Sequence, residues 1–175
     1  MLMSAMEIIS TPRLILRSPL SGDLQNLHNH VLSDPDVMKM AFAGVTLSFG
    51  QSKQFFDTNF DHDHSGRKLG ILIERETEMF VGIAGLLPCN VLNSPEYECG
   101  FVLRRSVWGR GYATEIARRQ VEYGLSELHL DRVLAQVAPR NQGSVAVLKK
   151  IGMKFHKSVQ SAERGERHVY VVNRV

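Results

Sequence analysis

The feature that most constrains this chain is the stretch 101–117, where an apolar run leads through a glycine-rich turn into a helical pattern. Gly109 and Gly111 flank Arg110, so the backbone of the turn is bare and can fold closely around a ligand. The residues that follow recur at three- and four-residue steps, which predicts a helix with one buried face. These residues are Ala113, Ile116, Ala117, Gln120, Val121, Gly124, Leu125 and Leu128. The unpaired N–H groups of the first helical turn would favour a phosphate in the glycine turn.

A Gly-x-Gly turn before a helix is a weak signal by itself, because ordinary strand-to-helix turns also contain it. Two better-known phosphate motifs are excluded. The Gly-Lys-Ser/Thr ending of a P-loop is missing, and Thr114 stands where the third glycine of a dinucleotide-binding fingerprint would be. The interpretation of the turn therefore depends on the rest of the chain.

Three stretches carry a family resemblance. Residues 108–115, Trp-Gly-Arg-Gly-Tyr-Ala-Thr-Glu, resemble the acetyl-CoA pyrophosphate loop of the GNAT-type N-acetyltransferases. The resemblance is closest to the branch that acetylates ribosomal-protein N-termini, the RimJ/RimL-like proteins. Residues 141–153 are similar to the Asn-x-x-Ser signature, with Leu, Lys and Gly after it, that follows the fifth strand of that family. The pattern 13–17, Asp23 and Asp34-Pro35 resembles the start of the same branch.

The order of predicted elements agrees with that resemblance over nearly the whole chain. The sequence predicts a strand, two helices, three strands, a helix, a strand, a helix and two strands. We expect an α/β (α+β) GNAT fold in one domain, residues 1–175, whose mixed, splayed sheet of about seven strands is flanked by about four helices. The predicted strands are 11–17, 69–73, 80–87, 96–103, 132–137, 153–159 and 167–172. Three other helices are predicted. The first begins at Ser21-Gly22-Asp23 and is ended by Asp34-Pro35-Asp36, and the other two begin at Ser48 and at Gln142.

Composition narrows the class of protein. A chain of 175 residues, 43% apolar and 22% charged, suits one soluble domain with a full core. A net charge of +3 is too small to indicate a nucleic-acid partner. No apolar run would cross a membrane, and residues 1–7 lack the features of a signal peptide. Cys89 and Cys99 lie in apolar surroundings, which predicts buried free thiols. We therefore expect a cytoplasmic protein without a nucleic-acid or membrane partner.

The run Asp61-His62-Asp63-His64 looks at first like a metal site. Alternating residues at a helix end point in different directions, whereas a metal needs three or four convergent ligands. We therefore expect no metal. His28 and His30 are expected at the surface or at the rim of an acceptor cleft.

The resemblance implies acetyl-CoA as cosubstrate and assigns residues to it. In the family the strand that corresponds to 101–103 carries a bulge whose N–H binds the thioester oxygen, and it splays from the next strand to admit pantetheine. Asn141 would contact the pantetheine arm or the acceptor and Ser144 would lie near the sulfur, although both also suit a helix cap. The cosubstrate residues implied are Phe101, Val102, Leu103, Trp108, Gly109, Arg110, Gly111, Tyr112, Ala113, Thr114, Asn141 and Ser144. The cations available for its phosphates are Arg104, Arg105, Arg110 and Arg140.

The implied reaction is direct transfer of acetyl from sulfur to an amine. Leu148 stands where many family members have the tyrosine that protonates the leaving thiolate, so Ser144 is the substitute acid or only orients the cosubstrate. Glu98 is the candidate base, with a solvated or ion-paired carboxylate as the alternative. A lysine amine costs about 3 kcal/mol more to deprotonate at neutral pH than an α-amine, so an α-amine is the easier acceptor.

The function expected is therefore N-acetylation, with a protein N-terminal amine as the acceptor. A small-molecule acceptor (polyamine, amino acid or drug) is the alternative among enzymes, and a non-catalytic CoA-binding regulatory domain is the alternative of another class. We expect acceptor choice to lie in 37–49, in the helix with Phe55-Phe56 and in the closing hairpin 162–167. Dimers are common in the family, which leaves a homodimer open.

Overall fold

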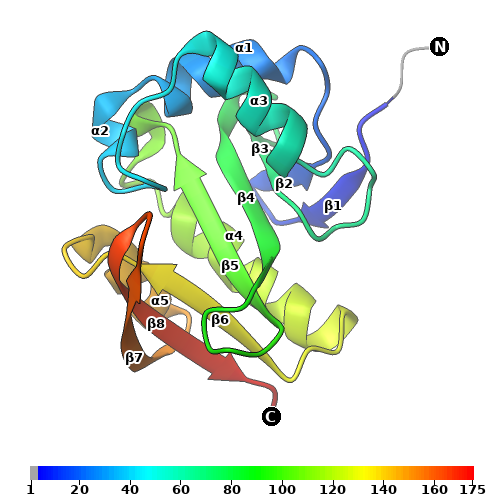
Figure 1. Ribbon diagram of the computed structural model, residues 1–175. Helices are drawn as coiled ribbons and strands as arrows, with labels where there is room; N and C mark the ends of the chain where they lie inside the picture. Colours follow the sequence, from blue (N-terminus) through cyan, green and yellow to red (C-terminus); the bar gives the residue numbers. More distant parts are fainter. Residues whose placement is uncertain (1–3) are drawn as a thin grey trace.

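The computed structural model of the chain describes residues 4–175 and is built around one mixed sheet (Figure 1). Over these residues the sheet has eight strands in the order β1-β2-β3-β4-β5-β6-β8-β7. The strands are β1 (Glu7–Ser10), β2 (Leu14–Arg17), β3 (Gly70–Glu74), β4 (Phe80–Cys89), β5 (Glu96–Leu103), β6 (Arg132–Val137), β7 (Lys154–Ser161) and β8 (Gly165–Asn173). Every neighbouring pair is antiparallel except β5 and β6, which are parallel.

The parallel pair is where the sheet opens. β5 and β6 are paired only at Glu98 opposite Leu134, whereas β4 and β5 keep an unbroken antiparallel register from Gly82–Leu103 to Cys89–Glu96. Figure 1 shows the light-green β5 and the yellow β6 diverging toward their arrowheads. The predicted splay is thus confirmed. The predicted bulge at 101–103 is wrong for the pairing with β4; the register shift in this region lies between β3 and β4.

Helices cover both faces of the sheet. They are α1 (Asp23–Leu27), α2 (Pro35–Met38), α3 (Phe49–Asn59), α4 (Tyr112–Glu122) and α5 (Gln142–Lys150), with a 3₁₀ turn, η2 (Arg105–Val107), and two π-helical turns, η1 (His28–Leu32) and η3 (Tyr123–Glu127). Successive side chains of a strand point to opposite faces. Accordingly Ile71 and Ile73 of β3 pack with α1, α2 and α3, while Leu72 packs with α4. The central strands β3 and β4 are therefore buried on both sides, whereas the edge strand β7 is mostly exposed.

Most predicted elements are present, and the structure adds the strand β1 and the helix α2. β1 raises the number of strands to eight, because four residues on a sheet edge give too short a period to recognise in sequence. The strand predicted from Thr11 is β2, and it begins at Leu14. The helix predicted over 112–128 is confirmed as α4 followed by η3.

The helix starts near the N-terminus correct two expectations. Asp34-Pro35-Asp36 does not only end a helix; it begins α2, because Asp34 accepts from the N–H groups of Asp36 and Val37 and Pro35 occupies the first turn. α1 lacks the side-chain cap predicted at Ser21-Gly22-Asp23, since the Asp23 carboxylate binds Arg17 and the Leu20 N–H instead. At α3 the predicted start is confirmed, and a capping box between Ser48 and Gln51 forms it.

Asp61 has a structural role in the run Asp61-His62-Asp63-His64. Its side chain is fully buried and accepts hydrogen bonds from the Ser65 N–H, the Ser65 hydroxyl and the Gly66 N–H at 2.8, 2.8 and 2.9 Å. Asp63 is exposed beside Lys68 at 3.3 Å. Across residues 4–175 no three His, Cys, Asp or Glu side chains are grouped as metal ligands would be. None of the helices in this range combines the length and apolarity that a bilayer crossing requires.

Replacing Asp61 by alanine should therefore lower the free energy of unfolding by about 2–4 kcal/mol, because three donors lose a buried acceptor. Urea denaturation of Asp61→Ala measures the loss. Asp63→Ala is the matched control and should change stability little, since its ion pair is exposed. Equal losses in the two variants would contradict the structural role of Asp61.

Candidate active site

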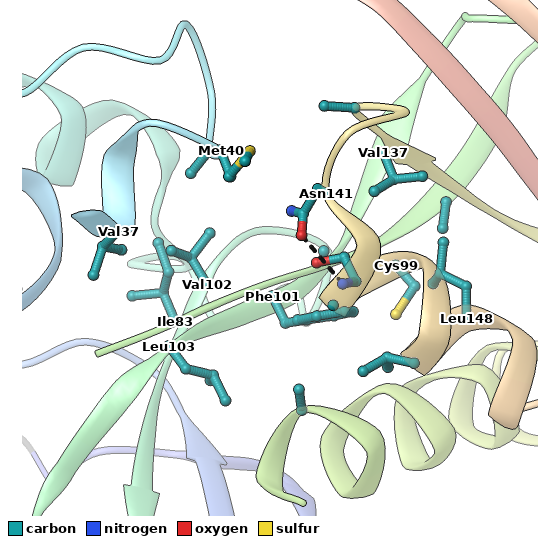
Figure 2. A pocket seen from close by; sticks show the side chains of 18 of the residues that line it. Val37, Met40, Ile83, Cys99, Phe101, Val102, Leu103, Val137, Asn141 and Leu148 are labelled. Atoms are coloured by element: carbon teal, nitrogen blue, oxygen red, sulfur yellow. Dashed lines mark hydrogen bonds between the residues drawn. The ribbon is translucent and has the colours of Figure 1, made fainter. Parts of the chain in front are cut away.

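One cavity of about 970 Å³ occupies the opening between β5 and β6. Figure 2 shows its two sides: Val37 and Met40 lie on one, Val137, Asn141 and Leu148 on the other, with Phe101 and Val102 between them. The glycine turn, the start of α4 and the start of α5 line the cavity as well. The splay of two strands thus brings both sequence motifs to one place.

The glycine turn ends at the bare N-terminus of α4. Gly109 and Gly111 have φ of +81° and +80°, a left-handed conformation that favours glycine. Gly111 is the N-cap of α4 and no side chain caps the helix. A Cβ on Gly111 would meet the Arg13 guanidinium at 3.4 Å and one on Gly109 would meet nothing within 4 Å, so the turn needs glycine for its conformation more than for space. The free N–H groups and the helix dipole there suit a phosphate.

A carboxylate behind the turn fixes its position. Glu115, in the first turn of α4, accepts from the Thr11 hydroxyl at 2.6 Å and from the Arg13 N–H at 2.9 Å, and it pairs with the Arg13 guanidinium. Arg13 also donates to the Arg110 carbonyl at 2.9 Å. Burial alone would raise the pKa of Glu115, but the bonds from Thr11 and Arg13 outweigh it and hold that pKa below its ordinary value. This link could not be predicted from sequence, because its partners are about a hundred residues apart in the chain.

Asn141 and Ser144 form a helix cap at the edge of the cavity. The Asn141 side chain accepts from the Ser144 N–H at 3.2 Å and so caps α5, as the dashed line in Figure 2 shows. Both residues also line the cavity. Leu148, one turn after Ser144, is buried in the wall and has no proton to donate.

All but one of the residues that the sequence assigned to the cosubstrate line the cavity, and the exception is Arg110. Its side chain is exposed and does not line the cavity. The others do: Phe101, Val102, Leu103, Trp108, Gly109, Gly111, Tyr112, Ala113, Thr114, Asn141 and Ser144. Trp108 is half exposed and its indole N–H donates to the Leu103 carbonyl at 3.0 Å, which ties the turn to the end of β5.

The arginines considered for the phosphates also divide into those that line the cavity and those that do not. Arg105 pairs with Asp36 at 2.7 Å and with Asp34 at 3.5 Å, and Arg104 donates to the Phe80 carbonyl, so both are engaged outside the cavity. Arg140 does line it. Lys150, at the end of α5, also lines it and was missed, because a lysine in a last helical turn has an ordinary electrostatic explanation. Neither His28 nor His30 is among the lining residues.

Glu98 lies in the cavity wall, at the one position where β5 is paired with β6. It is half-buried, and the loss of solvent raises the pKa of its carboxyl above the ordinary value, although a hydrogen bond from Gln136 and the charge of Arg164 oppose the rise. Gln136 of β6 donates that bond through its side-chain amide. Glu98 is thus neither freely solvated nor ion-paired, unlike Glu96 on the same strand, which pairs with Arg132.

The two thiols are free. Cys99 is buried and Cys89 is half-buried, so the expectation of burial is confirmed fully for Cys99 alone. Burial, aided by the charge of Glu98, raises the pKa of Cys99 to about 12 and that of Cys89 to about 11. Cys99 lines the cavity, yet a thiol with this pKa supplies almost no thiolate at neutral pH.

The site is thus a sheet that opens at a parallel pair of strands beside an uncapped helix N-terminus, around a cavity of about 970 Å³. The comparison with protein families is specific: the acetyltransferase (GNAT) domain matches residues 13–154, and the chain belongs to this family. Among curated relatives, an uncharacterized N-acetyltransferase from Bacillus subtilis, YnaD, is 31% identical over 146 residues, which cover 83% of this chain and 82% of YnaD.

Solved structures agree on the fold. A GNAT-family acetyltransferase from Bacillus anthracis superposes with a TM-score of 0.80 at 26% identity, over 94% of this chain and 97% of the other. Two more distant structures are named for different acceptors. They are RimL, a ribosomal L7/L12 α-N-protein acetyltransferase in complex with coenzyme A (TM-score 0.77, 14% identity, 98% of each chain), and the Vibrio cholerae spermidine N-acetyltransferase with CoA and spermine (0.75, 18%, 94% and 97%). At these identities they show the shared fold and leave the acceptor open.

If the glycine turn binds the pyrophosphate, Gly111→Asp should weaken CoA binding by about tenfold or more, since the variant adds strain and a negative charge beside the phosphate. Calorimetry with CoA measures the change. Gly44→Asp is the control, because Gly44 has the same left-handed φ of +81° outside the cavity. Unchanged affinity in a folded Gly111→Asp protein would contradict the assignment of the turn.

Proposed function

We propose that this protein transfers the acetyl group of acetyl-CoA directly to a primary amine, and that the amine is the N-terminal α-amine of a protein. The observation that carries the proposal is the single cavity of the splayed sheet. It is lined by the glycine turn and also by Glu98 and residues of 36–42, so a donor and an acceptor can meet in it.

The donor half suits coenzyme A. Its phosphates would lie against the N–H groups at the start of α4, and Lys150 in the same lining is a cation available to them. The pantetheine arm would follow the gap beyond Glu98–Leu134, where β5 offers backbone groups that β6 does not pair. Asn141 and Ser144 stand beside that gap and would orient the arm.

Glu98 is the group we assign as base. A carboxylate with a raised pKa is a better proton acceptor than an ordinary glutamate, and Gln136 holds it in one orientation. Ser144 is the hydroxyl near the expected position of the leaving sulfur; CoA thiolate is a good leaving group, so orientation alone suffices for that role. Both thiols are excluded as nucleophiles by their raised pKa values.

The charges of the lining argue against a polyamine. The cavity is lined by two acidic side chains and five basic ones: Asp36 and Glu98, and Lys39, Arg140, Lys150, Arg164 and Arg167. Asp36 is neutralised by Lys39 at 3.2 Å and by Arg105 at 2.7 Å. A polycation would meet mainly like charge here. An α-amine, which loses its proton near pH 8, carries less charge to the site.

The base assignment predicts a pH-dependent defect in Glu98→Gln. Because the pKa of Glu98 is raised, activity of the parent should rise with pH through that pKa as the carboxylate forms. The variant should lose about tenfold to a thousandfold in kcat/KM near neutral pH, with part of the loss recovered at higher pH as free amine accumulates. A pH–rate profile from thiol release measures both effects.

Glu96→Gln is the control for that experiment, since Glu96 lies on the same strand but outside the cavity and pairs with Arg132. It should keep the parent's profile. A Glu98→Gln profile that coincides with the parent's would remove Glu98 as the base.

The N-terminal assignment predicts that a peptide beginning with Ser or Ala is acetylated with higher kcat/KM than free Ser or Ala, because contacts beyond the first residue stabilise the transition state. Blocking the α-amine should stop turnover even when the peptide contains lysine. Mass spectrometry of the products gives the site of acetylation. Higher kcat/KM for spermidine or for free amino acids than for every peptide would support the small-molecule alternative, and CoA binding without turnover of any amine would support the regulatory one.

A further inference from the structure

The closing hairpin contributes two arginines to the lining of the cavity. Arg164 lies in the turn between β7 and β8, Arg167 lies on β8, and both line the cavity. Arg167 is only 6% exposed. Its guanidinium donates to the Phe42 carbonyl at 3.0 Å, which places it beside the segment between α2 and α3.

Neither arginine has an anionic partner within residues 4–175. No ion pair formed in this range involves Arg164 or Arg167. The Nε atoms of both are buried and have no hydrogen-bond partner in the described structure. Arg140, the next cation in the lining, donates only to the Lys39 carbonyl at 3.3 Å and brings a further positive charge.

Such an arrangement is costly without a ligand. A buried cation loses hydration, and like charges beside it add repulsion. Burial, followed by the charges of Arg164 and Arg140, accordingly lowers the pKa of Arg167. Arginine presents its donors in a planar fork that matches a carboxylate, and a charge-assisted pair of this kind satisfies the unmet donors.

The contacts of the arginine pair differ from those of the glycine turn, although both line the same cavity. Arg167 instead touches the 36–42 segment, and Arg164 is close enough to Glu98 to influence the pKa of its carboxyl. The cationic pair and the assigned base thus belong to one acceptor pocket.

We infer that Arg164 and Arg167 bind a carboxylate of the acceptor, so that the substrates are amines with an acidic group close to the reacting nitrogen. The inference rests on the proposed acetyl transfer and narrows its acceptor. The carboxylate has two sources: an acidic side chain in the first residues of a protein N-terminus, or the α-carboxylate of a free amino acid.

Matched acceptors separate these sources. One pair of peptides differs only by Glu or Gln at the second residue, another only by Asp or Asn at the first, and a third pair is free serine and serine amide. Each is assayed for kcat/KM with saturating acetyl-CoA, and calorimetry with the CoA-loaded protein measures binding independently of turnover. We expect the acidic member of at least one peptide pair to be favoured about tenfold or more in both measurements.

Variants test whether these two arginines cause the preference. Arg164→Gln and Arg167→Lys should abolish the preference for acidic acceptors while leaving the KM for acetyl-CoA within about twofold. Arg174→Gln, an exposed arginine outside the cavity, is the control and should keep it. Arg164→Glu should reverse the preference toward a Lys-containing peptide, which keeps the test decisive if Arg167 variants fold poorly.

The outcomes are distinct. Preference for serine over its amide, without any preference among the peptides, would keep the carboxylate site and reject the protein N-terminus. Acidic and neutral acceptors that bind and react equally would overturn the inference, as would a preference that survives in Arg164→Gln and Arg167→Lys. Failure of every amine to react would reject the proposed transfer, and the calorimetric comparison would still decide whether the pair binds a carboxylate.

Discussion

The site depends on a sheet that is paired at a single point between two parallel strands. Glu98 and Leu134 hold β5 and β6 together, and beyond them the strands separate. Backbone groups at such an opening need partners from elsewhere, and a ligand with amide and carbonyl groups can supply them. The same opening lets side chains from both faces of the sheet reach one cavity, since Cys99 packs with α4 and α5 while Val102 packs with the helices of the other face.

Each side of the opening has its own strand pairing, and the ion pair of Arg132 with Glu96 joins β6 to β5. β4 and β5 are joined by a long unbroken register, and β6 pairs with β8 from Arg132–Asn173 to Val137–His168. The link from Thr11 and Arg13 to Glu115 then fixes the start of α4 against β2. The glycine turn is therefore held from behind by the N-terminal strands, so its open side stays free for a ligand.

The charges of the cavity are arranged in opposition. Glu98 is half-buried with a raised pKa, whereas Arg167 is buried with a lowered one, and Arg164 acts on both. An acceptor whose amine lies by Glu98 and whose carboxylate lies by the arginines would match this dipole. A polycation would not, although spermidine acetyltransferases share the fold.

The sequence by itself determined the family and most of the elements, and eleven of the twelve residues that it assigned to the cosubstrate line the cavity. The glycine turn, the helix pattern after it and the Asn141-x-x-Ser144 motif are local, and local patterns report backbone conformation directly. Only the tertiary structure decided which charged groups meet. It excluded Arg110 and Arg105 from the cavity and brought in Arg167, because ion pairs and burial depend on residues that are distant in the chain. The sequence predicted three segments for acceptor choice but not which of their charged side chains would meet, because that depends on how the segments pack against one another.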